Sequence, residues 1–172
     1  MVPTSVILNR KRFKTIALLI LIMYLVDTCV VIRGFKEGGA SHKIWESMEA
    51  QEETFVALTD FNLHELEKHG EHKLVRKVHS AIESGAVPMF EIGVHPGDWA
   101  GEKQYERLVD PEIVQLVEDP SDAVLIAAAE QLKAEGVITL DRHHLYTGKL
   151  WSYLEQKGIG LYKPNEFVSE HL

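Results

Sequence analysis

Four acidic residues occupy positions in the sequence from which carboxylates can do chemistry: Asp27, Glu65, Asp122 and Asp141. Asp27 and Asp141 each follow a short apolar stretch typical of a buried strand, while Glu65 and Asp122 lie early in predicted helices. If the strands are neighbours in a parallel sheet, their carboxyl ends meet at one edge, where ligands bind. Clustered carboxylates raise one another's pKa or hold cations, and hard oxygen ligands select Mg²⁺ or Mn²⁺. Because such a cation can activate water at a phosphodiester, the pattern indicates a metal-dependent nuclease.

Each acid also has a purely structural interpretation. Asp122 can favour the positive end of a helix dipole. Glu65 can form a capping pair with Asn62, three residues before it. Asp27 and Asp141 can cap a helix that follows each strand. Spacing alone leaves both kinds of interpretation open.

The stretch from Glu118 to Asp141 is the clearest structural signal in the chain. Asp119 has the character of an N-cap, and Pro120 suits the first position of a helix because its missing N–H costs nothing there. The apolar residues that follow predict a wide buried face. Gly136 is expected at the C-terminus of this helix with a positive φ, and residues 137–140 are expected to form a strand that leads into Asp141.

The rest of the chain alternates between short apolar strands and helices. We expect strands over 24–26, 55–58, 87–92 and 159–162, and helices over 42–51, after 59 with Glu65 on it, over 74–82, over 105–117 with an interruption at Pro111, and over 150–156. Strands of this kind, apolar on both faces, are typical of a mainly parallel sheet covered on both sides by helices. The predicted fold class is therefore α/β.

Composition sets limits on partners and compartment. A chain of 172 residues with 45% hydrophobic and 26% charged residues is expected to form one globular domain. The net charge of −8 argues against a broad basic surface for nucleic acid, so a polyanionic substrate needs a local basic rim or bound cations. The single cysteine, Cys29, rules out a disulfide within the chain and fits a reducing cytoplasm.

The amino terminus has a different character from the rest of the chain. Basic residues from Arg10 to Lys14 precede an apolar run over 16–26, as in a signal peptide, but no small-residue cleavage pattern follows. The run is shorter than the ~20 residues of a membrane span, and extending it would place Asp27 in lipid at a cost of roughly 3 kcal/mol. Membrane contact through this segment, or a start codon assigned too early, stays open. We divide the chain into an appendage (1–22), a domain (23–168) and a tail (169–172).

Five short stretches together resemble a PIN domain. The similarity extends roughly from Met23 to Phe167, and the order and intervals of the stretches make the match more specific than any one of them alone. The stretches are VDTCVVI within Met23 to Phe35, NLHEL within Thr59 to Lys68, DPSDAVLIAAA from Asp119 to Ala129, VITLD from Val137 to Asp141, and GIGLYKPNEF from Gly158 to Phe167.

The resemblance implies a three-layer α/β/α fold and a metal-dependent endoribonuclease that cleaves RNA. In the PIN pattern, Asp27, Glu65, Asp122 and Asp141 match the acids that bind Mg²⁺ or Mn²⁺ and position the attacking water. Thr28 matches a hydroxyl residue that contacts metal-bound water or the phosphate.

The family also suggests partners. Many small PIN proteins are toxins of VapBC-type pairs, which form homodimers and are inhibited by a small antitoxin. The loop from His95 to Trp99 and the basic amino terminus do not belong to the family pattern. The alternative function is a PIN-like RNA-binding or scaffold protein that no longer cleaves RNA.

Other residues have weaker functional interpretations. Arg33 and Arg142 are candidates for contact with the RNA backbone, and equally for a solvated surface. His64 and His69 suggest a zinc-binding helix, but their i, i+5 spacing turns one away from the other's face, so we do not expect zinc. Cys29 is expected to be a packed residue rather than a nucleophile, because no histidine lies near it in the sequence.

Overall fold

Five parallel strands form a single central sheet in the described part of the chain. The computed structural model describes residues 22–50, 54–69, 72–97, 103–141 and 145–172. The strands lie in the order β3-β2-β1-β4-β5, with bounds β1 (Met23–Val26), β2 (Phe55–Thr59), β3 (Met89–Phe90), β4 (Gly136–Ile138) and β5 (Gly160–Tyr162). This arrangement confirms the predicted α/β class.

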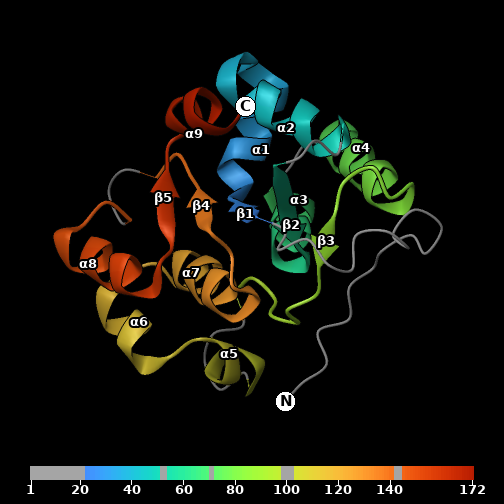
Figure 1. The fold of residues 1–172 in the computed structure, drawn as a ribbon. Helices are drawn as coiled ribbons and strands as arrows, with labels where there is room; N and C mark the ends of the chain where they lie inside the picture. Colours follow the sequence, from blue (N-terminus) through green and yellow to red (C-terminus); the bar gives the residue numbers. More distant parts are fainter. Residues whose placement is uncertain (1–21, 51–53, 70–71, 98–102, 142–144) are drawn as a thin grey trace, which may run out of the picture.

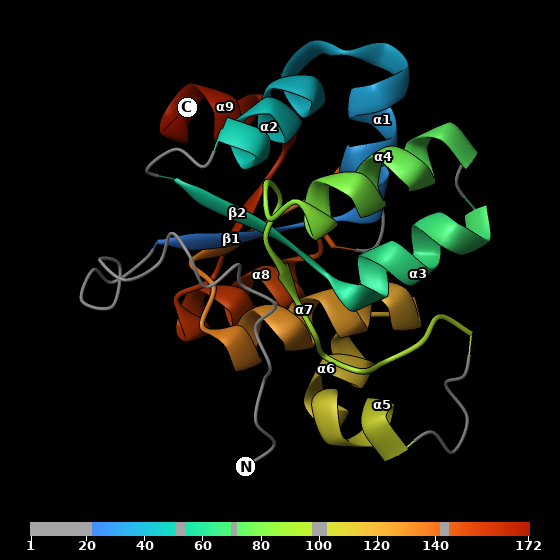
Figure 2. The same cartoon turned by 90° about the vertical axis from the view of Figure 1, so that its right-hand side faces the viewer.

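Helices cover both faces of the sheet and complete the three layers expected of a PIN-like fold (Figures 1 and 2). One face packs against α1 (Thr28–Glu37), α2 (Gly39–Ala50), α3 (Asp60–His69), α4 (His72–Glu83) and α9 (Pro164–His171). The other face packs against α7 (Pro120–Leu132) and α8 (Gly148–Lys157), and α5 (Lys103–Leu108) and α6 (Pro111–Leu116) pack against α7.

The central strand β1 shows why its sequence is apolar throughout. Met23 and Leu25 belong to the hydrophobic core beneath α7, whereas Tyr24 and Val26 belong to the core beneath α1 and α2. All four side chains are buried. Because neighbouring residues of a strand point to opposite faces, a strand between two layers of helices must be apolar at every position.

The helix α7 begins where the sequence predicts. The carboxylate of Asp119 accepts a hydrogen bond of 2.8 Å from the backbone N–H of Ser121, and Pro120 occupies the first turn. Eight residues of α7 are buried, which explains its nearly uniform apolar sequence. Its C-cap is Lys133, which adopts the left-handed conformation with a φ of 55°.

The prediction that Gly136 ends this helix is wrong. Gly136 is the first residue of β4, where it pairs with Tyr24 on one side and Gly160 on the other. A Cβ atom at Gly136 would lie 2.7 Å from Cε2 of Tyr162 and 2.8 Å from the carbonyl oxygen of Gly160. Glycine is needed here because the space is filled, rather than because the backbone requires a positive φ.

The other predicted elements are present with shifted ends, and β3 is shorter than expected. The helix α9 is an addition, since the sequence suggested only a proline-containing tail after β5. Pro164 begins α9, and Phe167 buries its ring in the core beneath α2. The helix α9 extends to His171, past residue 168 where the predicted domain ends. The division of the chain into 1–22, 23–168 and 169–172 stays a prediction.

The apolar run over 16–26 lies mostly outside the described residues, and its last four residues form β1. Among the described helices, none has both the length and the apolar character that a membrane crossing needs.

Candidate active site

The four acids predicted to act together line one pocket of about 430 Å³. Asp27 follows β1, Asp141 lies beyond β4, Glu65 is on α3 and Asp122 is in the first turn of α7. The pocket is therefore at the carboxyl edge of the sheet, as expected for a parallel α/β fold. Other polar side chains that line it are Thr28, Cys29, Asn62, His69, Asp119 and Ser121.

Asp27 is held at the junction of β1, α1 and β4. It is the N-cap of α1, and its Oδ1 accepts a hydrogen bond of 3.4 Å from the backbone N–H of Cys29. Its Oδ2 accepts one from Oγ1 of Thr139 at 2.6 Å and one from Sγ of Cys29 at 2.9 Å. The capping interpretation of Asp27 therefore holds, and it coexists with the placement of the carboxylate in the pocket.

Glu65 is joined to α1 through a hydroxyl. Oγ1 of Thr28 donates a hydrogen bond of 2.6 Å to Oε2 of Glu65, and Nδ2 of Asn62 donates one of 3.0 Å to Oγ1 of Thr28. The buried hydroxyl of Thr28 thus orients Glu65 toward Asp27 at the start of α1. The expected contact between Thr28 and water or phosphate stays a prediction.

The capping pair proposed for Asn62 and Glu65 is wrong. Asn62 instead pairs with Thr59. The side-chain Oδ1 of Asn62 accepts a hydrogen bond of 2.8 Å from the backbone N–H of Thr59, and the backbone N–H of Asn62 donates one of 3.4 Å to Oγ1 of Thr59. The capping box therefore begins one residue before α3, at the end of β2. This arrangement leaves the side chain of Glu65 directed to Thr28 and the pocket.

The environment raises the pKa of Glu65 above its usual range. Burial is the largest cause, and the negative charges of Asp27 and Asp119 add to it, while hydrogen bonds from Thr28 and Ser121 oppose the increase. Removal from water disfavours a charged carboxylate, as do nearby charges of the same sign. A proton or a cation at this position relieves both penalties.

Thr139 links the ends of the two central strands, and sequence reasoning missed it. The side chain is fully buried; besides donating to Asp27, its Oγ1 accepts a hydrogen bond of 3.0 Å from the backbone N–H of Asp141. A polar residue within the apolar strand sequence Val137 to Asp141 was the signal available. A buried hydroxyl needs a partner, and the two acids that follow β1 and β4 supply it.

The donor types in the pocket fit Mg²⁺ or Mn²⁺, which prefer carboxylate and other hard oxygen ligands. The arrangement of these side chains does not by itself define a metal site. Within the described residues, no group of three or more histidine, cysteine, aspartate or glutamate side chains is arranged so that it could hold a metal ion. The four acids line the same pocket, and their role as metal ligands stays a prediction.

Of the two arginines proposed for substrate contact, Arg33 lies on α1, away from the pocket. Nε of Arg33 contacts Oε2 of Glu37 at 2.7 Å on the exposed surface of α1, and Arg33 is not among the residues that line the pocket. Arg142 lies outside the described residues. Among the described lining residues, none is a lysine or an arginine, and His69 is the one histidine.

Cys29 is half-buried and packs at the edge of the core beneath α1. Burial raises the pKa of its thiol, and the charge of Asp27 and the hydrogen bond to Asp27 raise it further. These surroundings disfavour the thiolate, which is the nucleophilic form of cysteine. The ring of His64, for which zinc was considered, lies against that of His95, with centroids 4.3 Å apart and an interplanar angle of 41°.

One solved structure with a similar fold is the crystal structure of VapBC2 from Rickettsia felis bound to a DNA fragment from their promoter. The match has a TM-score of 0.51 and 13% sequence identity, and it covers 82% of this chain and 98% of that chain. The two chains share a fold. No family model matches the sequence, and no curated protein matches it. The likeness agrees with a PIN-like three-layer arrangement.

Proposed function

We propose that this chain is a PIN-domain endoribonuclease that uses Mg²⁺ or Mn²⁺ to hydrolyse RNA phosphodiester bonds. The observation that carries the proposal is the convergence of Asp27, Glu65, Asp122 and Asp141 on one pocket at the carboxyl edge of the sheet. These residues are distant in the sequence, and with Asp119 they bring five carboxylates to one pocket, where negative charges repel one another unless a proton or a cation offsets them. The likeness in fold to a chain of a VapBC complex supports the same function.

In this proposal, Asp27 and Asp141 are metal ligands, and Glu65 and Asp122 complete the site. A bound divalent cation supplies charge neutralisation at the scissile phosphate and makes water more acidic. The chain's own contribution is to orient the carboxylates, through Thr139 for Asp27 and through Thr28 for Glu65.

Cleavage of a labelled RNA with Mn²⁺, with Mg²⁺ and with EDTA tests the proposal. We expect cleavage with either metal, none in EDTA, and a loss of at least about 100-fold for Asp27→Asn, since removing one electrostatic group from an active site commonly costs that much. Asp110→Asn is a matched control, because Asp110 also caps a helix with its carboxylate but lies outside the pocket. Cleavage that persists in EDTA or in Asp27→Asn contradicts the mechanism.

A second candidate is a PIN-like protein that binds RNA or acts as a scaffold without cleaving. Two observations favour it: both oxygens of Asp27 already accept hydrogen bonds, and the described side chains do not form a three-ligand metal group. Binding of RNA that does not depend on metal, with no cleavage by freshly purified protein at any Mn²⁺ concentration, distinguishes this function from the first.

The biological setting of the nuclease is also a proposal. We infer a cytoplasmic toxin that forms a homodimer and is inhibited by a small antitoxin, in line with the fold it shares with a chain of the VapBC2 complex. Growth arrest on expression, relieved by a small protein encoded beside this chain, tests the toxin role. Sedimentation of the purified chain tests the dimer, and flotation with vesicles tests membrane contact through residues 1–22.

A further inference from the structure

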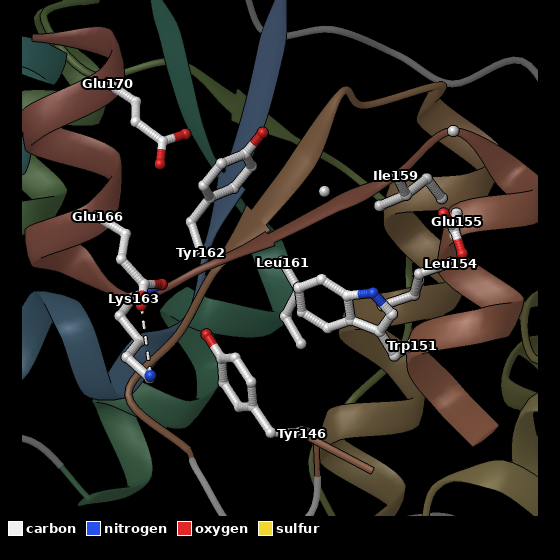
Figure 3. A pocket seen from close by; sticks show the side chains of 12 residues that line it. Tyr146, Trp151, Leu154, Glu155, Ile159, Leu161, Tyr162, Lys163, Glu166 and Glu170 are labelled. Carbon is white, nitrogen blue, oxygen red and sulfur yellow. Dashed lines mark hydrogen bonds and ion pairs between the residues drawn. The ribbon is translucent and has the colours of Figure 1, made fainter. Parts of the chain in front are cut away.

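A second and larger groove, of about 670 Å³, runs along β5 at the edge of the sheet. It lies between α8 and α9 and shares no lining residue with the candidate active site. Figure 3 shows that side chains from α8, β5 and α9 surround an open trough with the edge strand along its floor. A function located here is independent of the nuclease proposal.

The backbone of β5 presents hydrogen-bonding groups to this groove. The N–H of Gly160 donates to the carbonyl of Glu135 at 2.7 Å, and the carbonyl of Tyr162 accepts from the N–H of Thr139 at 3.0 Å, so both residues face β4. Consecutive residues of a strand direct their backbone groups to opposite sides, so those of Leu161 point away from β4. No described strand lies on that side. Such an edge is a template for one more strand.

The two sides of the groove differ in chemistry. On the α8 side the wall is mostly apolar and aromatic, with Glu155 as its acidic residue, and Trp151 is about half exposed. On the α9 side the wall is acidic (Figure 3). The apolar wall contains Tyr146, Trp151 and Leu161, and the acidic wall contains Tyr162, Glu166 and Glu170. Leu161 and Tyr162 belong to the cores on opposite faces of the sheet, so the groove extends across the edge from one face to the other.

The charge of the groove favours a basic segment over a second copy of this chain as its occupant. Among the described residues that line it are three glutamates, including Glu155 on α8, and one lysine, Lys163, whose ammonium contacts Oε1 of Glu166 at 3.3 Å. The ammonium of Lys163 also lies 5.1 Å from the ring centroid of Tyr146. A second copy of this edge would bring like charges together, which is unfavourable. A basic segment would complement them.

We propose that the free edge of β5 binds an extended, basic segment of a partner protein as an additional strand of the sheet. The side chains of an added strand alternate between the two faces. Apolar side chains of the partner pack against Trp151 and Leu161, and the alternate basic side chains pair with Glu166 and Glu170. The recognised sequence therefore alternates apolar and basic residues.

The test uses a fluorescein-labelled peptide of eight residues that alternates lysine and valine, with the full-length chain. We expect saturable binding by fluorescence anisotropy that weakens as salt is raised, because exposed charges are screened. Trp151→Ala and Glu170→Lys should each weaken binding by at least about five-fold, as expected for anchor positions in a small interface. A peptide with N-methyl groups on one edge should lose at least about ten-fold, because strand addition depends on main-chain hydrogen bonds.

Glu83→Lys is the matched control, since it makes the same charge change at an exposed position at the end of α4. Circular dichroism is the check that each variant is folded. Equal binding of the N-methylated peptide, or equal weakening by Glu83→Lys and Glu170→Lys, would mean that the peptide meets only a diffuse negative surface, and the proposal is then wrong. It is also wrong if the peptide fails to bind and the chain forms a dimer that Trp151→Ala dissociates, because a second copy then covers the edge.

Discussion

Thr139 and Asp27 are 112 positions apart in the sequence, and Oγ1 of Thr139 donates a hydrogen bond of 2.6 Å to Oδ2 of Asp27. The same hydroxyl accepts the backbone N–H of Asp141. One buried side chain thus connects the ends of β1 and β4 and positions two of the acids that line the pocket.

Replacing Thr139 with valine keeps the shape of the side chain but removes both hydrogen bonds. We expect a loss of about 1 kcal/mol in the free energy of unfolding, because the half-buried carboxylate of Asp27 keeps only its hydrogen bonds from Cys29 and the backbone N–H of Asp141 loses its acceptor. Urea denaturation measures this loss. Thr139→Ser retains the hydroxyl and should keep most of the RNA cleavage activity that Thr139→Val loses; equal activity in the two variants would show that the hydroxyl does not position Asp27.

Glu65 makes stability depend on pH in a defined direction. Folding raises its pKa through burial first and through nearby acids second. The folded state therefore holds the proton more tightly than the unfolded state, so the contribution of Glu65 to the free energy of unfolding is complete below the unfolded pKa and is lost as the pH rises through the folded pKa. Without metal, Glu65→Gln should gain stability relative to the parent chain as the pH rises from mildly acidic to neutral. Urea denaturation across that range measures the difference, and a difference that does not change with pH contradicts the assignment.

The thiol of Cys29 should react slowly with iodoacetamide. Burial and the carboxylate of Asp27 raise its pKa, and the thiolate is the reactive form. Because Cys29 is the only cysteine in the chain, mass spectrometry reports its modification directly. We expect Asp27→Asn to accelerate alkylation of the folded protein by removing the nearby negative charge, whereas in urea both proteins should react alike. Rapid alkylation of the folded parent chain would contradict the raised pKa.

Gly136→Ala should destabilise the sheet by about 1–3 kcal/mol, which is the usual cost of overpacking. The added methyl group would meet the ring of Tyr162 and the carbonyl oxygen of Gly160 at less than ordinary contact distance. Gly148→Ala is a suitable control, because nothing lies within 4 Å of the position of its Cβ. Thermal unfolding compares the two variants, and equal melting temperatures would show that β4 and β5 can separate without cost.

The fold was predictable because its signals are local. Apolar strands that end in Asp27 and near Asp141, and a helix that opens with Asp119 and Pro120, are each visible in a few consecutive residues. In a parallel sheet, such local signals are enough to place strand ends, and hence the acids, at one edge.

The contacts that orient the acids were not predictable, because they join residues from different elements. Asn62 could pair with Thr59 or with Glu65, and in the structure its side chain accepts from Thr59 at the point where β2 passes directly into α3. Thr139 resembles any residue of a β-branched strand until β1 is placed beside β4. Gly136 has the same sequence context as a helix-ending glycine, and the ring of Tyr162 excludes a side chain there.

The position of β1 in the middle of the sheet also determines when the pocket can form during synthesis. β1 emerges from the ribosome early, but one of its two neighbours, β4, lies more than 100 residues later in the chain. A nascent polypeptide therefore cannot bring Asp27 and Asp141 together until the residues of β4 have been synthesised. The side chains that line the pocket are thus gathered only after synthesis has passed Asp141, the last of the described lining residues along the chain.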